Sequence, residues 1–181
     1  MEFFTVGHYN HSKQQFLQLL KAAEVKIVAD VRSLPGSRKN PQFNKNQLRS
    51  WLDEAGLKYQ HFKKLGGRRK LSGQVGEELN SGWQNRSFHN YADYSLTEEF
   101  KQGIDELKAA SSHGKVVLMC SERHPSRCHR LIISNYLKAN DFSVTHIIPN
   151  PDREARFVDH ELGKWGAMPI IESNGSVVYP K

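Results

Sequence analysis

The sequence predicts an α/β fold: a three-layer sandwich around a mainly parallel, Rossmann-like sheet, with a C-terminal β-hairpin appendage. Short runs of β-branched and aromatic residues alternate with amphipathic segments of helical period, which favours parallel strands joined by right-handed crossovers. This alternation stops near residue 150, and Asn174–Gly175 then lies between two apolar runs, a strong hairpin signal. We therefore expect an α/β domain over residues 1–149 and an extension over 150–181 that packs on it.

The first third of the chain contains three predicted strands and two predicted helices. Ser12 and Gln15 have the spacing of a capping box, which begins a helix whose apolar residues share one face. Asn44 is predicted to cap the second helix and Gly56 to end it. The strand-like runs cover residues 3–7, 25–29 and 57–62.

The middle of the chain interrupts this rhythm and the remainder resumes it. The polar stretch 63–90 is too long for an ordinary connection, so we interpret it as a functional or mobile loop. A third helix is predicted to start at Ser95–Glu98. A buried strand over 116–120 leads through a charged loop into a further helix, and a fifth strand covers 142–148.

Bulk composition excludes several classes of protein. A chain of 181 residues with 38% hydrophobic and 25% charged residues is typical of one globular domain. Its apolar runs are far too short to span a membrane. The N-terminal segment lacks a signal-like region, and two cysteines are too few for a disulfide framework, so we expect a cytoplasmic protein.

The net charge of +7 favours an anionic partner, either a phosphate-containing small molecule or nucleic acid, and no membrane. An inert basic surface is the alternative interpretation. Clustering favours the first, because many cations fall within one third of the chain. These are Arg38, Lys39, Lys45, Lys63, Lys64, Arg68, Arg69 and Lys70.

Both cysteines lie in the loop between the strand ending at Cys120 and the next helix. A thiolate at the end of a strand, facing a helix N-terminus and flanked by Arg123, Arg127 and Arg130, would be stabilised. Cys120 is therefore a candidate nucleophile, although free cysteines often only pack as small apolar residues. The arginines and helix amides predict an anion-binding site whichever residue does the chemistry.

Two other interpretations of this loop remain open. Cys120, His124, Cys128 and His129 include the ligand types of a zinc site, but their spacing does not match the usual paired pattern. A reversible disulfide between Cys120 and Cys128 is also conceivable. We expect no metal and no cofactor.

The opposite wall of the site is predicted to come from earlier strands. Asp30 and Arg32 end the second strand and so reach the same sheet edge, where they bind substrate, assist catalysis or brace a loop by a salt bridge. Glu122 is the best candidate for a general acid or base. The predicted catalytic residues are Cys120, Glu122 and Asp30, and the predicted substrate-binding residues are His8, Arg32, Arg38, Tyr91, Arg123, Arg127, His129 and Arg130.

Aromatic residues interleave with the basic cluster, an arrangement that suits stacking on nucleobases. The competing interpretation is that part of the set anchors the long loop on the domain. The set comprises Tyr59, His61, Phe62, Trp83, Phe88, His89, Tyr91 and Tyr94.

Separated motifs of this chain resemble the domain of unknown function 488 family. They are Thr5–His8, Asp30–Pro35 with Ser37–Arg38, Asn40–Phe43, Leu65–Gly67, Phe88–Ala92 with Glu99–Phe100, and Cys120–Glu122 with Cys128–Arg130. The resemblance implies an α/β fold and a shared pocket, but no activity. Ser121 stands where the family commonly has alanine. A weaker likeness links the chain to rhodanese-like sulfurtransferases and cysteine phosphatases, whose loop from cysteine to arginine is shorter than Cys120–Arg127.

The sequence thus favours an enzyme that acts on a phosphate-containing, nucleotide or nucleic-acid substrate through an Arg/Cys/Glu anion pocket. A non-catalytic nucleic-acid-binding module and a thiol- or metal-dependent sensor are the alternatives.

Overall fold

A computed structural model describes all 181 residues, and its centre is a six-stranded sheet with the strand order β3-β2-β4-β1-β5-β6. The first five of these neighbours run parallel, and β6 is antiparallel to β5. The strands are β1 (Glu2–Gly7), β2 (Ile27–Asp30), β3 (Lys58–His61), β4 (Val116–Cys120), β5 (Ser143–Ile147) and β6 (Phe157–Asp159).

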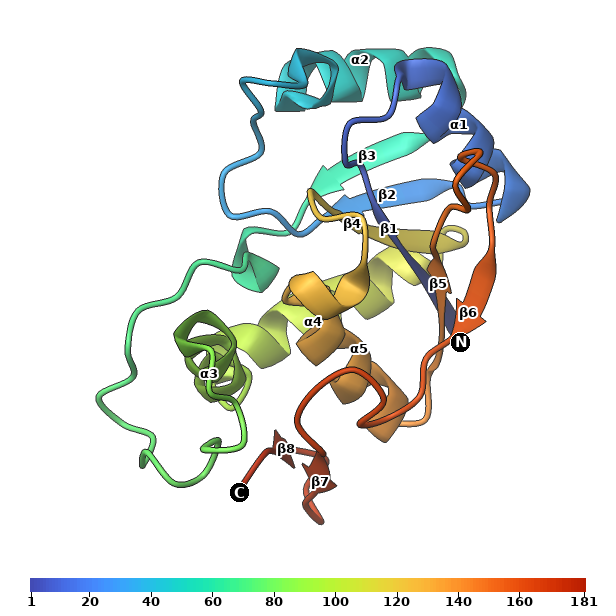
Figure 1. Ribbon diagram of the computed structural model, residues 1–181. Helices are drawn as coiled ribbons and strands as arrows, with labels where there is room; N and C mark the ends of the chain where they lie inside the picture. Colours follow the sequence, from blue (N-terminus) through green and yellow to red (C-terminus); the bar gives the residue numbers. More distant parts are fainter.

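Helices cover both faces of the sheet, which confirms the predicted three-layer α/β fold (Figure 1). One face carries α1 (Lys13–Ala22) and α2 (Lys45–Glu54). The other carries α3 (Arg86–Tyr94), α4 (Glu98–Ser111) and α5 (Arg130–Ala139). Three short 3₁₀ turns, η1 (Pro41–Phe43), η2 (Lys63–Leu65) and η3 (Pro125–Arg127), complete the connections.

Side chains that alternate along each strand build two separate hydrophobic cores. In β1, Phe3 packs against the face of α3, α4 and α5, whereas Phe4 and Val6 pack against the face of α1 and α2. Such alternation follows from the two-residue period of a strand. Cys120 belongs to the core beneath α5, so its side chain points to the face on which its own loop continues.

The helix starts agree only in part with the predicted caps. Ser12 and Gln15 form the predicted capping box of α1. Asn44 occupies the N-cap position of α2, but its side-chain oxygen accepts a hydrogen bond from the Ser37 amide at 2.6 Å instead of capping the helix. Helix α4 begins at Glu98, within the predicted start at Ser95–Glu98, and Thr97 is its cap, because its side chain accepts a hydrogen bond from the Phe100 amide.

The interpretation of 63–90 as one loop was also wrong at its C-terminal end, since α3 begins at Arg86. Asn85 caps this helix by accepting hydrogen bonds from the amides of Ser87 and Phe88. The buried side of α3 includes His89 and Asp93, so it lacks the aliphatic spacing that indicates a helix.

The C-terminal extension contributes to the sheet and to the core. It supplies β6 and then the predicted hairpin, formed by β7 (Ile170–Ile171) and β8 (Val177–Val178). Tyr179 follows β8 and is fully buried, with its hydroxyl accepting a hydrogen bond from Asn135 of α5 at 3.0 Å. No helix of the chain is both long enough and apolar enough to cross a membrane.

The strand order creates a topological switch point between β2 and β4. These strands are neighbours, but the connection after β2 leads to α2 on one face and the connection after β4 leads to α5 on the other. The two loops therefore diverge at the carboxyl ends of the strands, which is where open α/β sheets bind their ligands.

Candidate functional site

A pocket of about 400 Å³ lies at this switch point. The segments after β2 and β4 form two of its walls, and residues from the long loop and the start of α3 form the remainder. The lining residues are Arg32, Ser33, Leu34, Gly36, Gly67, Arg68, Asn85, Ser87, Phe88, Cys120, Ser121, Glu122, Arg127, Cys128 and His129.

Two glycines allow the walls to approach this closely. A β-carbon at Gly7, the last residue of β1, would collide with the backbone carbonyl of Glu122. A β-carbon at Gly67 would collide with the imidazole of His129. The absence of a side chain at both positions thus fixes where the loop after β4 passes and how near the long loop comes to it.

The β2 wall is held by a buried ion pair. The Asp30 carboxylate accepts hydrogen bonds from Nε and Nη2 of Arg32 at 2.9 and 2.8 Å, and from the Tyr59 hydroxyl at 2.5 Å. Asp30 is fully buried and Arg32 nearly so. With both carboxylate oxygens occupied and no contact with the pocket, Asp30 is placed as a support for Arg32 rather than as a group facing substrate.

His8 continues this support from β1. Nη1 of Arg32 donates to its Nε2 at 3.3 Å, and its Nδ1 donates to the Tyr9 carbonyl, while the ring stacks on Phe43. Burial lowers the pKa of His8 to about 4, so the ring is neutral at pH 7, as an acceptor from arginine must be. His8 therefore also lies behind the pocket wall. Asp30 and His8 thus engage three of the five N–H donors of Arg32, which also lines the pocket.

The sulfur atoms of Cys120 and Cys128 meet at the other wall, bonded as a disulfide, which is one of the alternatives open from the sequence. Reaction of Cys120 as a nucleophile therefore requires the reduced pair. Nε of Arg130 donates to the Cys120 sulfur at 3.0 Å, and Nη2 donates to the Glu122 carbonyl at 2.5 Å. Arg130 is fully buried and does not line the pocket, so the structure places it beneath the loop, not at the predicted substrate-binding surface.

The remaining charged residues of this loop point in different directions. Arg123 turns away from the pocket and donates to the Pro149 carbonyl at 2.5 Å, which ties the loop to the segment after β5. Arg127 and Glu122 are exposed on the pocket wall, and neither side chain forms a hydrogen bond or ion pair within the chain. These two, with Cys120 and His129, are the predicted residues of the loop that the structure brings to the pocket.

His129 joins the two walls. Its Nε2 donates to the Val31 carbonyl at 2.7 Å, which leaves Nδ1 unprotonated and facing the Cys128 sulfur at 3.5 Å. Burial lowers the pKa of His129 to about 4 and keeps it neutral. Tyr91 packs edge-on against its ring and donates to the Leu65 carbonyl at 2.8 Å. Tyr91 is fully buried, so it positions His129 and offers no surface to a substrate.

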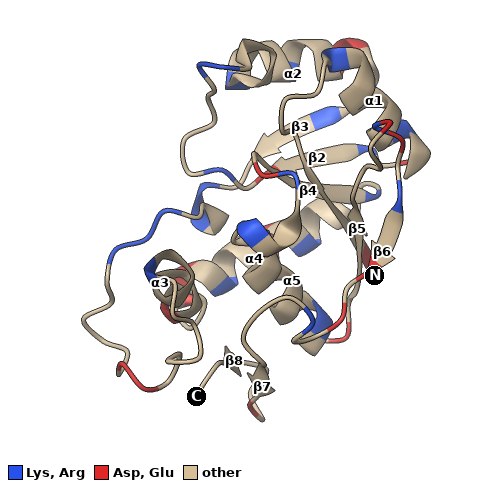
Figure 2. Cartoon of the chain, in the orientation of Figure 1, with Lys and Arg blue, Asp and Glu red and all other residues tan.

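The basic cluster divides into pocket and support residues. Lys and Arg side chains lie along the segment between η2 and α3 and along the loop that leads into α2 (Figure 2). Arg68 is exposed, lines the pocket and has no side-chain partner. Arg69 instead lies 3.6 Å over the Tyr94 ring and donates to carbonyls of Lys63 and Gly66, so it holds the loop in place.

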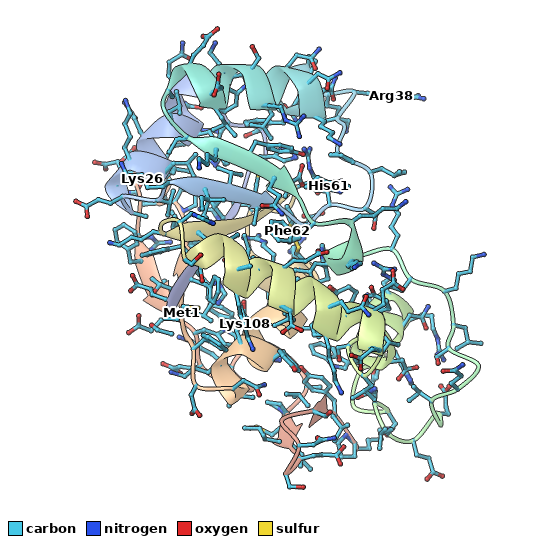
Figure 3. The ribbon with its side chains drawn as sticks, turned by 180° about the vertical axis from the view of Figure 1, so that it is seen from behind. Met1, Lys26, Arg38, His61, Phe62 and Lys108 are labelled. Carbon is cyan, nitrogen blue, oxygen red and sulfur yellow. A yellow bond between two sulfur atoms is a disulfide. The ribbon has the colours of Figure 1, made fainter.

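Arg38 is a predicted residue that does not line this pocket. Its side chain extends outward from the loop before α2, away from the body of the chain (Figure 3). It borders a second depression beside the main pocket, which His8 and Glu122 also line. Arg38 and Arg32 thus line different depressions and do not share one wall as predicted.

No three residues among His, Cys, Asp and Glu are arranged to hold a metal ion. Of the four residues considered for zinc, Cys120 and Cys128 form a disulfide with each other, and His129 donates a hydrogen bond to the Val31 carbonyl. The His124 Nδ1 is engaged by Ser126.

Several pocket residues were absent from the predicted site, namely Ser33, Gly67, Arg68, Asn85, Ser87 and Phe88. Arg68 and Phe88 carried a signal, as members of the basic cluster and of the interleaved aromatic set. The cap of α3 brings Asn85, Ser87 and Phe88 to the pocket, and this placement depends on a helix that the sequence pattern did not indicate.

Comparison with known proteins gives a family but no activity. No curated protein and no solved structure matches the chain. The profile of the family described as "Domain of unknown function DUF488" matches residues 12–137, which span β2, β3, β4, all five helices except the end of α5, and both main walls of the pocket. The chain therefore belongs to the DUF488 family.

Proposed function

We propose that the chain is an enzyme that binds a phosphate-containing substrate, a nucleotide or a nucleic-acid segment, in the switch-point pocket. The observation that carries this proposal is the pair Arg68 and Arg127. They come from different walls, line one pocket and have no partner within the chain. Unpaired guanidinium groups that converge on a cavity suit the bidentate recognition of phosphate.

The other lining residues suggest how the substrate would be oriented. Arg32 adds a third cation to the lining, and Glu122 is the one carboxylate among the lining residues. Phe88 lines the same pocket and is backed by Trp83, with ring centroids 5.1 Å apart, so a nucleobase could stack on a supported aromatic surface. In this arrangement the arginines hold phosphate, while Glu122 acts as general acid or base, or reduced Cys120 acts as nucleophile.

The test measures binding and chemistry separately. A fluorescently labelled single-stranded oligonucleotide and a nucleoside triphosphate serve as probes for the wild type and for Arg68→Ala and Arg127→Ala. Each substitution is expected to weaken binding about tenfold, the loss that corresponds to about 1.4 kcal/mol. Lys21→Ala is the matched control, because it removes one exposed cation from the last turn of α1, at the other edge of the sheet. Equal affinity of all four proteins would contradict the proposal.

Turnover distinguishes an enzyme from a non-catalytic nucleic-acid-binding module. Glu122→Gln and Cys120→Ser are expected to retain probe binding and to lose at least one turnover activity that the reduced wild-type protein displays on a panel of nucleotides and oligonucleotides. A wild-type protein that binds these probes with a steep salt dependence but converts none of them would favour the binding module instead.

A further inference from the structure

Arg130 is a buried cation without a buried anion. It is fully buried, and no carboxylate forms an ion pair with it. Burial lowers the pKa of its guanidinium to about 9, so it stays charged at neutral pH. An uncompensated charge in the interior is costly, and such groups are normally paired. The shortest contact of Arg130 to a group that can become negative is the 3.0 Å hydrogen bond from Nε to the Cys120 sulfur.

Another contact of Arg130 begins a series of hydrogen bonds between neutral groups. Nη1 donates to the Thr5 hydroxyl at 3.4 Å, and this hydroxyl contacts Nδ1 of His146 at 2.7 Å. Nε2 of His146 contacts Nδ1 of His160 at 2.8 Å, and Nε2 of His160 contacts the amide oxygen of Asn135 at 2.7 Å.

The proton positions in this series of hydrogen bonds can be assigned from its last member, Asn135. The Asn135 oxygen can only accept, so His160 carries its proton on Nε2, His146 carries its proton on Nε2, and Thr5 donates to His146. Burial lowers the pKa of His146 to about 2 and that of His160 to about 4, consistent with two neutral rings. This series of hydrogen bonds fixes the orientation of Arg130 and supplies no negative charge.

The charged and titratable groups around the two sulfurs are mostly cationic or neutral. His8, His124 and His129 are neutral rings with lowered pKa values, and Asp30 is already paired with Arg32. Arg127 and Glu122 are exposed on the pocket wall. The negative charge of Glu122 opposes the effect of burial on the pKa of Arg130, but its exposed carboxylate forms no ion pair with the guanidinium. Cys120 is therefore the ionisable group in direct contact with Arg130.

We propose that the pocket is a thiol–disulfide exchange site, in which reduced Cys120 is a thiolate at neutral pH with Arg130 as its counter-ion, and Cys128 is the resolving thiol. The charged donor at 3.0 Å selects Cys120 over Cys128, whose sulfur receives only the Arg130 backbone amide at 3.4 Å. Nδ1 of His129 lies 3.5 Å from the Cys128 sulfur, so in the reduced pair it is placed to accept a hydrogen bond from the Cys128 thiol and to orient it. This activity goes beyond the proposed phosphate chemistry and does not depend on it.

The oxidant is a low-molecular-mass disulfide. The Cys120 thiolate attacks one of its sulfurs, the disulfide bond of the oxidant breaks, and one thiolate leaves while a mixed disulfide forms on Cys120. Cys128 then attacks the Cys120 sulfur, its proton goes to the second departing thiolate, and the Cys120–Cys128 disulfide remains. Two electrons pass from the protein to the oxidant, and the oxidised product is the bonded pair seen in the structure.

The first experiment measures the charge state of Cys120. The reduced Cys128→Ser variant is alkylated with iodoacetamide between pH 5 and 10, and the site is confirmed by peptide mass spectrometry. We expect the rate to reach half its maximum below pH 7, whereas an unperturbed cysteine does so near pH 8.5. In the same background, Arg130→Gln is expected to slow alkylation at pH 6 at least tenfold, and Arg130→Lys to restore part of the rate. A midpoint at or above pH 8.5 with Arg130 intact overturns the proposal, whether or not Arg130→Gln folds.

The second experiment assigns the two cysteines with oxidised glutathione as the probe. The reduced wild type should lose two hydrogen atoms and retain no glutathione, Cys128→Ser should stop as a glutathione adduct on Cys120, and Cys120→Ser should react at least tenfold more slowly. Adducts that form first on Cys128, or on both residues at equal rates, overturn the assignment. Because no phosphate takes part, failure here leaves the Arg68 and Arg127 binding test unaffected, and the reverse also holds.

Discussion

Replacement of Asp30 by asparagine tests whether this residue supports the pocket wall. Asp30 is fully buried and accepts hydrogen bonds from Nε and Nη2 of Arg32 and from Tyr59. Asparagine keeps the shape of the side chain but removes its charge. The Arg32 guanidinium, only 7% exposed, would then lie in the interior without a counter-ion.

The expected loss follows from that uncompensated charge. Breaking a buried ion pair by removing one partner costs about 3–5 kcal/mol. For a chain of this length, about 2–4 °C of melting temperature corresponds to each kcal/mol, so Asp30→Asn should lower the melting temperature by about 6–20 °C. Tyr59→Phe leaves the ion pair intact and should cost only about 1.5 kcal/mol. Circular dichroism measures both losses, with urea unfolding for the free energy and thermal unfolding for the melting temperature.

A double variant separates charge compensation from other effects. Replacing a buried ion pair by apolar groups is often nearly neutral, so Asp30→Asn combined with Arg32→Met should be more stable than Asp30→Asn alone. The expected coupling between the two sites is about 2 kcal/mol or more. A loss below about 1 kcal/mol for Asp30→Asn, or additive losses in the double variant, would refute this role.

Three further predictions concern stability. His146 and His160 are neutral in the folded chain but titrate near pH 6.5 in the unfolded chain, which therefore binds more protons below pH 6.5. The free energy of unfolding should consequently fall between pH 6.5 and pH 4, by up to about 1.4 kcal/mol per pH unit for each ring. Urea titrations at several pH values measure this fall. Gly7→Ala should destabilise the chain and weaken probe binding, because its β-carbon meets the carbonyl of the loop after β4, whereas Gly73→Ala, with open space around it, should do neither. Tyr179→Ala should cost about 3–5 kcal/mol in thermal unfolding, since this ring is fully buried.

The order of strands and helices could be predicted because local patterns carry it. The strand ending at Cys120 and the helix beginning near Arg130 were both visible as apolar runs of different period. The edge strand β6 and helix α3 were not visible. Phe157–Asp159 is only three residues long, and α3 buries polar side chains such as Asp93, whose carboxylate accepts a hydrogen bond from Asn80 at 2.7 Å.

The residues of the site could be predicted more readily than their roles. Sequence proximity grouped Arg123, Arg127 and Arg130 as equivalent anion ligands, but the three side chains point to a neighbouring segment, to the pocket and to the interior. Burial and contact partners decide between these roles, and both depend on strands distant in sequence. The Thr5 hydroxyl, for example, accepts a hydrogen bond from Arg130, although the two residues are 125 positions apart in the sequence.

The arginines near the pocket thus differ in burial: Arg130 lies in the interior, whereas Arg68 and Arg127 are exposed on the pocket walls. Arg130 is neutralised by Cys120 only when the sulfur is reduced, so oxidation of the pair removes the anion while the cation stays buried. Reduction should therefore destabilise the folded chain less than the loss of a cross-link alone predicts, because the thiolate restores an ion pair with Arg130 as the disulfide is lost. Arg68 and Arg127 have no such tie to the redox state, since each is exposed and unpaired. Phosphate probes should consequently bind both forms of the protein, and any turnover that needs the Cys120 thiolate should appear only in the reduced one.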